Sequence, residues 1–181
     1  MHKEDSELLL EFRNEATKEN AFNQILKKYQ ERLYWHIRRM IVSHEDTNDV
    51  LQNLFVKVWK GLQNFREDSQ LYTWLYRIAT NESLTFLEQQ KKHASVSMTD
   101  LEDTLGNRIK ADQNFDATRL EWKLQLAIQS LPERQKLVFN LRYYDELPYQ
   151  EMSKILETSE GALKASYHHA AKKVEEYIKT H

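Results

Sequence analysis

Residues 145–169 read DELPYQEMSKILETSEGALKASYHH, and this stretch decides the fold expected for the C-terminal part of the chain. Pro148 is suited to the start of a short helix, because its fixed φ and missing N–H fit the first helical turn. Residues 157–159 then form a turn, and Ser159 is a good N-cap for a second helix that begins near Glu160. The stretch therefore predicts two short helices around a tight turn, which is a helix-turn-helix.

The outer side of the second helix carries polar residues. A helix-turn-helix places the N-terminal half of its second helix in the major groove of DNA. The candidate contacts with the bases and phosphates of such a groove are Lys164, Ser166, His168 and His169. Ordinary packed helices with a solvated outer face would produce the same pattern, so this motif alone leaves both interpretations open.

Composition favours an all-α protein. The chain has 181 residues, of which 40% are hydrophobic and 30% charged, with only three glycines and two prolines. So few turn residues favour helices with short connections. The absence of cysteine excludes disulfides and cysteine nucleophiles. The N-terminus is too charged for a secretory signal, and no apolar run approaches the ~20 residues of a membrane span. We therefore expect a cytoplasmic protein without membrane insertion.

The net charge is unusual for a protein that binds DNA. It is −2, whereas a free-standing DNA-binding protein normally has a basic surplus that neutralises phosphates. Binding to nucleic acid would have to rest on local basic faces or on a larger partner that holds the DNA. A candidate basic face lies on the helix predicted over residues 21–41, although a solvated helix face is the ordinary meaning of such charge.

The N-terminal half shows helical periodicity. Apolar residues recur at intervals of three and four from 21 to 41, and residues 44–47 interrupt the pattern. A second helix is expected from residue 49 to 62, capped by Thr47 or Asn48. Residues 64–70 are predicted to form a loop before a third helix.

The C-terminal half is separated by a polar segment. Residues 93–115 have no clean period and are predicted to be a linker. Two further helices precede the helix-turn-helix, the second of them starting at Pro132. The expected architecture is two small helical domains, residues 1–92 and 116–181.

The C-terminal segment resembles a known family. LPERQKLVFNLRYYDELPYQEMSKILETSEGALKASYHHA resembles the promoter-binding domain of sigma factors of bacterial RNA polymerase, and particularly the extracytoplasmic-function (ECF) group. Pro148, Glu157 and Ser166 depart from the family pattern, so base preferences are not carried over. The matching positions are Leu131, Pro132, Leu147, Glu151, Gly161, Lys164 and Ala170.

The N-terminal half resembles the same family. DVLQNLFVKVWK is similar to the helix by which sigma factors dock on the clamp of the polymerase β′ subunit. The resemblance implies that docking residues are Asp49, Gln52, Asn53, Phe55 and Trp59. The segment that follows resembles the one that opens the minus-ten promoter element. Because opening exposes bases that stack on aromatic rings, the expected minus-ten residues are Arg66, Tyr72, Tyr76, Arg77 and Asn81. Trp74 and Leu75 are predicted to be core, with Trp74 supporting the loop.

Both segments together imply a sigma factor that is not an enzyme. The expected partners are core RNA polymerase, through its β′ clamp and β subunit, promoter DNA, and an anti-sigma factor. We expect a monomer when free, and no cofactor or metal, since adjacent helical residues such as His168 and His169 point ~100° apart. The linker would thread the active-site and RNA-exit region of the enzyme. The alternative is a stand-alone helix-turn-helix regulator that dimerises on DNA without polymerase; a helical interaction module is a third possibility.

Overall fold

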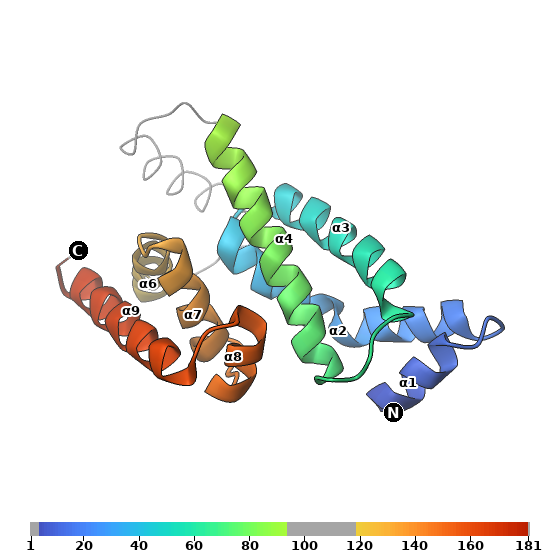
Figure 1. Cartoon of the computed structure of the whole chain (residues 1–181). Helices are drawn as coiled ribbons and strands as arrows, with labels where there is room; N and C mark the ends of the chain where they lie inside the picture. Colours follow the sequence, from blue (N-terminus) through green and yellow to red (C-terminus); the bar gives the residue numbers. More distant parts are fainter. Residues whose placement is uncertain (1–3, 94–118, 181) are drawn as a thin grey trace.

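The computed structural model describes residues 4–93 and 119–180, and all regular secondary structure in these two ranges is helical (Figure 1). The all-α prediction is confirmed, while nearly all of the predicted linker, residues 94–115, lies outside the described residues. No helix within these ranges is both long and apolar enough to cross a membrane. The helices are α1 (Asp5–Phe12), α2 (Lys18–Ile41), α3 (His44–Leu62), α4 (Leu71–His93), α6 (Arg119–Gln129), α7 (Glu133–Tyr143), α8 (Tyr149–Leu156) and α9 (Glu160–Thr180).

Helices α2, α3 and α4 pack on one another and form the centre of the N-terminal half (Figure 1). Leu33 of α2, Leu54 of α3 and Leu75 of α4 are fully buried between them. Helix α1 packs on the first turns of α2, and its buried face includes Leu8 and Phe12. This helix was not among the predicted elements, because at eight residues it is too short to show more than one apolar turn.

Helix α3 begins earlier than expected. The break between α2 and α3 lies at Val42, whose φ of 71° interrupts the helical path. Ser43 is the N-cap, and its hydroxyl accepts a hydrogen bond from the backbone N–H of Asp46 at 3.3 Å. The expectation that residues 44–47 break the pattern, with Thr47 or Asn48 as the cap, is wrong because a two-residue connection is enough to reverse the chain here.

The C-terminal half is built around α6, α7 and α9. Their shared core contains Ile128, Phe139 and Val174. Helix α8 packs on α9 and forms with it the helix-turn-helix. Ser159 caps α9 as predicted, since its hydroxyl accepts from the N–H of Ala162 at 3.3 Å. Glu157 ends α8 in the left-handed conformation, with φ 51°, at a position where glycine would avoid a cost of about 1 kcal/mol.

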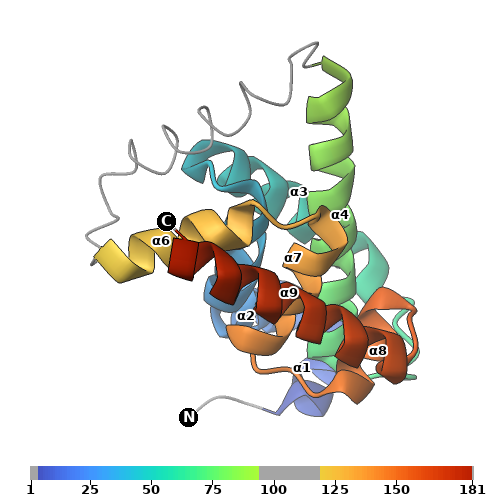
Figure 2. The ribbon, with the colours of Figure 1, turned by 90° about the vertical axis from the view of Figure 1, so that its left-hand side faces the viewer.

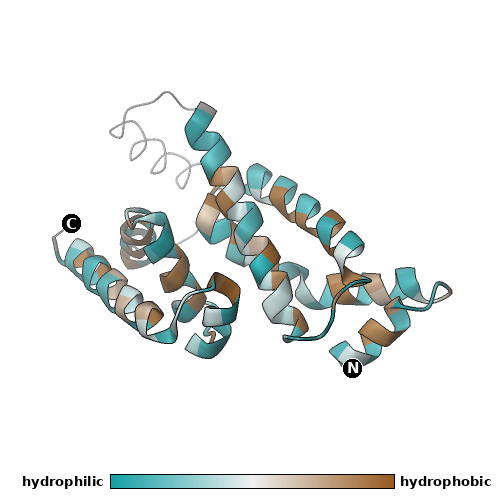
Figure 3. Ribbon diagram, viewed as in Figure 1, coloured by the Kyte–Doolittle hydropathy of each residue, from teal (hydrophilic) through white to brown (hydrophobic). Residues whose placement is uncertain are grey.

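The two halves pack against each other. Helix α8 lies beside α4, and α7 lies beside α2 (Figures 1 and 2). Their apolar residues form one continuous cluster, in which Leu141, Leu147 and Met152 join Leu75 and Tyr76. Brown and teal segments alternate along α3 and α9, as expected for helices that bury one side (Figure 3). This packing is consistent with the layout of two small helical domains, which contact each other through the shared apolar cluster.

A buried lysine lies in this interface. Lys136 is 7% exposed, and its ammonium donates a hydrogen bond to Gln129 Oε1 at 2.8 Å. The amide nitrogen of Gln129 in turn donates to the carbonyl oxygen of Arg39 in α2 at 2.9 Å. Burial, aided by the ammonium of Lys91, lowers the pKa of Lys136 to about 8, although Glu133 acts in the opposite direction. This lysine carries its positive charge in the interface at neutral pH at a cost to stability.

This cost predicts a rise of stability with pH. Between pH 8 and 10.5 the unfolded chain holds a proton on Lys136 that the folded chain has released. The free energy of unfolding should therefore increase across this interval, by at most about 3 kcal/mol. Lys136→Met should remove the increase, whereas the exposed Lys172→Met should keep it. Urea titrations at pH 7, 8, 9 and 10 measure the difference, and equal slopes for all three proteins would contradict the assignment.

Candidate nucleic-acid and polymerase-docking surfaces

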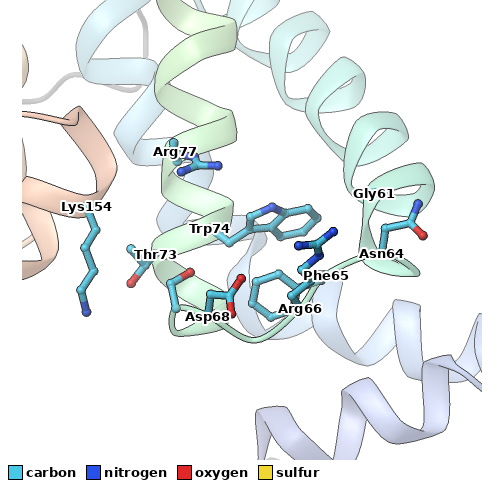
Figure 4. A pocket seen from close by; sticks show the side chains of 10 residues that line it. Gly61, Asn64, Phe65, Arg66, Asp68, Thr73, Trp74, Arg77 and Lys154 are labelled. Carbon is cyan, nitrogen blue, oxygen red and sulfur yellow. The ribbon is translucent and has the colours of Figure 1, made fainter.

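A cavity of about 480 Å³ lies between the loop that joins α3 to α4 and the first turns of α4 (Figure 4). The predicted loop is confirmed as the segment between Leu62 and Leu71. Lys154 of α8 forms one side of the cavity, across from the loop. The other residues that line it are Gly61, Asn64, Phe65, Arg66, Asp68, Ser69, Thr73, Trp74 and Arg77.

Two aromatic rings form the floor of the cavity. The rings of Phe65 and Trp74 have centroids 5.1 Å apart, and Figure 4 shows the indole between α4 and the end of α3. A Cβ at Gly61 would lie only 3.0 Å from the indole, so glycine is needed for the ring to lie this close to α3. Arg13 anchors the loop between α3 and α4, because its guanidinium donates to the carbonyl oxygen of Phe65 at 3.3 Å and to Glu67 at 2.8 Å.

The cavity brings together part of the predicted minus-ten set. Arg66 and Arg77 are exposed and line it, and Asn81 is exposed one turn further along α4. Leu75 is fully buried, as predicted. Trp74 is only half-buried and faces the cavity, so the prediction that it supports the loop is incomplete. Phe65 and Asn64 belong to the predicted loop, 64–70, but were not assigned individually as contact residues, since a single loop aromatic gives no periodic signal.

Tyr76 does not lie in the cavity. It is fully buried, and its hydroxyl donates to Asp145 Oδ1 at 3.3 Å. The prediction of Tyr76 as an accessible contact residue is wrong for this conformation. The physical reason is that Tyr76 shares a side of α4 with Thr73 and Thr80, and the C-terminal half covers that side. Tyr72 is half-buried at the edge of the same contact.

Three of the predicted docking residues lie on the outer side of α3. Asp49, Gln52 and Asn53 are exposed and follow helical spacing. Val56 continues the same stripe and is 49% exposed. It was missed in the sequence, although the i, i+3, i+4, i+7 spacing from Asp49 would have included it. We call these four residues the α3 stripe.

Phe55 and Trp59 lie beside the α3 stripe and are half-buried against the core. The indole of Trp59 makes edge-on contacts with Phe12 at 5.4 Å and Phe22 at 4.9 Å between ring centroids. The ammonium of Lys18 lies 5.4 Å from the same indole. Trp59 therefore ties α1 and α2 to α3, and only part of it is available to a partner.

The predicted minus-thirty-five residues are divided between the sides of α9. Lys164 and His168 are exposed and one turn apart, and the exposed Lys172 extends their line. The ammonium of Lys164 lies 5.6 Å from the ring centre of Tyr149 in α8. His169 is exposed on an adjacent side, whereas Ser166 is half-buried away from this line. Lys172 was missed because it lies beyond the quoted motif.

Comparisons with known protein families match both halves. The model of sigma-70 region 2 matches residues 25–93, and that of sigma-70, region 4 matches residues 121–174. The two regions follow each other in this order and define the class as an RNA polymerase sigma factor. The chain belongs to the sigma-70 family, in its ECF group.

Curated relatives are similar over most of their length. The chain is 30% identical over 168 residues to the ECF RNA polymerase sigma-E factor of Escherichia coli K12, which covers 88% of this chain and 87% of that protein. It is 27% identical over 166 residues to the RNA polymerase sigma-H factor of Pseudomonas aeruginosa, covering 87% and 86%.

Solved structures share the fold. CnrH in complex with the cytosolic domain of CnrY has a TM-score of 0.69 at 19% identity, with 97% of each chain covered. The sigma factor RpoE of Bartonella quintana, in complex with the anti-sigma factor NepR, has a TM-score of 0.69 at 18% identity, with 88% of this chain and 97% of that chain covered.

Proposed function

We propose that this chain directs core RNA polymerase to a set of promoters in the cytoplasm. The α3 stripe docks on the β′ clamp, the cavity captures a base of the opened minus-ten element, and α9 reads the minus-thirty-five element in duplex DNA. The observation that carries this assignment is the aromatic cavity beside two exposed arginines, close to an exposed stripe on α3. The chain itself is not an enzyme in this scheme, because the chemistry of RNA synthesis stays with the polymerase.

The cavity supplies what strand opening requires. Extruding a base from the duplex costs about a few kcal/mol, and stacking on an aromatic ring returns roughly 1–3 kcal/mol per base. The half-buried indole of Trp74 offers such a face and is backed by the buried ring of Phe65, and a volume of about 480 Å³ is within the range of ligand pockets. Arg66 and Arg77 at its rim are placed for phosphates of the displaced strand.

The low net charge fits a factor that works on a larger enzyme. Lys164, His168 and Lys172 give α9 a local basic line, while the whole chain carries −2. The polymerase would supply the general affinity for phosphates, and α9 would add discrimination between sequences. Weak binding by the free chain would keep promoters unoccupied when it is not on the enzyme.

Run-off transcription tests the proposal directly. Core polymerase is supplied with fragments of genomic DNA in the presence and absence of the protein, and new discrete start sites are expected only in its presence. The alternative, a stand-alone regulator, predicts no association with core polymerase and tight binding of a dimer to a symmetric site at physiological salt. That second result would overturn the proposal.

Val56 gives a residue-level test of docking. Val56→Asp places a charge at the centre of the α3 stripe and should weaken association with core polymerase roughly tenfold or more, because a buried unpaired charge is costly in an interface. Leu10→Asp is the matched control, since Leu10 is 69% exposed on α1 and outside the stripe. Association is measured by fluorescence anisotropy of labelled protein. Equal affinities of the two variants would contradict docking through this side of α3.

We also propose that the free chain is held by an anti-sigma factor. The structural neighbours described above are recorded in complexes of this kind, one with the cytosolic domain of CnrY and one with NepR. Affinity purification from cells should recover such a partner in addition to polymerase. Recovery of polymerase alone under every growth condition would count against it.

A further inference from the structure

Helix α1 is fastened to the rest of the N-terminal half at both of its ends. At its first turn, Asp5 accepts a hydrogen bond from the Tyr29 hydroxyl at 2.6 Å and another from the Lys28 ammonium at 2.8 Å. At its last turn, Phe12 is 1% exposed and meets the ring of Trp59 in α3 edge-on. Helix α1 is therefore a fixed base from which a side chain can hold another part of the molecule.

The residue that follows α1 reaches the loop between α3 and α4. Arg13 is the C-cap of α1, and its Nη2 donates both to the carbonyl oxygen of Phe65 and to the carboxylate of Glu67. These acceptors lie 52 and 54 residues further along the chain. Because the guanidinium is planar and rigid, one group fixes a backbone atom and a side chain of the loop together.

Residues 66–69 have few other constraints. In the part of the chain that the structure describes, no backbone–backbone hydrogen bond joins these four residues to any other. Glu67 has a φ of 61°, which lies in the left-handed region that a residue with a side chain rarely adopts. Such a conformation persists only where surrounding contacts hold it. Arg13 supplies two such contacts.

The loop is a wall with a cavity on each of its two sides. Arg66 and Asp68 line the aromatic cavity described above (Figure 4). Glu67 lines a second cavity of about 340 Å³, whose lining also includes Ser6 and Leu9 of α1. Since open space borders the loop on both sides, packing alone does not fix its path. The contacts from Arg13 therefore decide where the backbone of the loop runs.

We propose that Arg13 is a positioning residue for the minus-ten contact, and that α1 thereby belongs to the apparatus that captures the extruded base. The two residues that Arg13 holds flank Arg66, so its guanidinium sets the backbone from which Arg66 reaches the rim of the cavity. Arg13 acts through the loop, because it is not among the residues that line the cavity. The inference rests on the proposed function, since it takes this cavity as the site of base capture.

A single spin label can report on the loop, because the chain contains no cysteine. Asp68→Cys carries a nitroxide on the exposed residue next to Glu67. In the free protein, Arg13→Gln should at least double the mobile fraction of the label, since it removes both contacts. Arg13→Lys keeps the charge without the planar fork and should restore part of the immobile fraction. The matched control is Lys179→Gln, which removes one positive charge and an exposed ion pair within α9.

Transcription gives the functional measurement. On duplex promoters found by run-off transcription, Arg13→Gln should lower initiation about three- to tenfold relative to Lys179→Gln, and Arg13→Lys should recover part of the loss. Templates already unpaired at the minus-ten region should be affected less than twofold, because the captured base no longer competes with re-pairing of the duplex. Affinity for core polymerase should equal that of the control, since Arg13 lies outside the α3 stripe.

Urea titration separates positioning from a general role in folding. An exposed ion pair contributes little to stability, so Arg13→Gln should unfold at nearly the same urea concentration as Lys179→Gln. A clear loss of stability, an unchanged label spectrum, or a mobile loop with duplex transcription equal to that of the control would each refute the positioning role. If the unmodified protein supports no transcription at all, the proposed function itself fails. If it does and Arg13→Gln matches the control, only the present inference fails.

Discussion

Replacing Trp74 with alanine is expected to lower run-off transcription from duplex promoters roughly 10- to 100-fold. The indole forms the floor of the cavity together with Phe65, and stacking on one aromatic ring contributes about 1–3 kcal/mol, where 1.4 kcal/mol is a factor of ten. The loss should fall on strand opening. Transcription from a template whose minus-ten region is already unpaired should therefore be reduced much less.

Trp35→Ala is the matched control for this experiment. Trp35 is 50% exposed on α2, and it contacts Tyr34 edge-on without lining the cavity. Its removal deletes the same side chain and should leave transcription close to the original level on both templates. If Trp74→Ala loses equal activity on duplex and pre-opened templates, the cavity has no specific part in opening DNA.

Leu54→Ala is expected to reduce the free energy of unfolding by about 2–5 kcal/mol. Leu54 is fully buried where α3 packs on its neighbours, and deleting its side chain leaves a cavity that the helices cannot close. Val56→Ala, two residues away on the exposed α3 stripe, should change stability by about 0.5 kcal/mol or less. Urea titrations followed by circular dichroism measure both values.

The two α3 positions should also separate stability from docking. Leu54→Ala should keep its affinity for core polymerase at temperatures where it remains folded, whereas a charge at Val56 should weaken docking in a stable protein. A large loss of stability at Val56, or none at Leu54, would show that the assigned inner and outer sides of α3 are reversed.

Local signals in the sequence were reliable for the helices and their ends. The three- and four-residue spacing placed α2 and α4, and the Ser159 cap was correct because its hydrogen bond spans only three residues. The start of α3 was misplaced because the two-residue break at Val42 leaves little trace in the pattern. Short elements such as α1 are similarly invisible, since one apolar turn does not establish a period.

Assignments of exposed and buried sides were less reliable. Tyr76 was expected to meet DNA and is fully buried, while Val56 was passed over and is exposed. Tyr76 is covered by the C-terminal half, which is distant in the sequence, whereas Val56 stays exposed on the outer side of α3. Helical periodicity shows which residues share a side, but it does not show what covers that side.

By itself, the sequence determined the all-helical class, the helix-turn-helix and the resemblance to two sigma regions, because each of these follows from residue patterns along a continuous stretch of the chain. Only the tertiary structure decided that the two halves close on each other. The hydrogen bonds that join them span 78 residues from Thr73 to Glu151 and 109 residues from His36 to Asp145. Each carboxylate looks like an ordinary solvated residue in the sequence, because its partner's position follows from the packing of whole helices and from no local pattern.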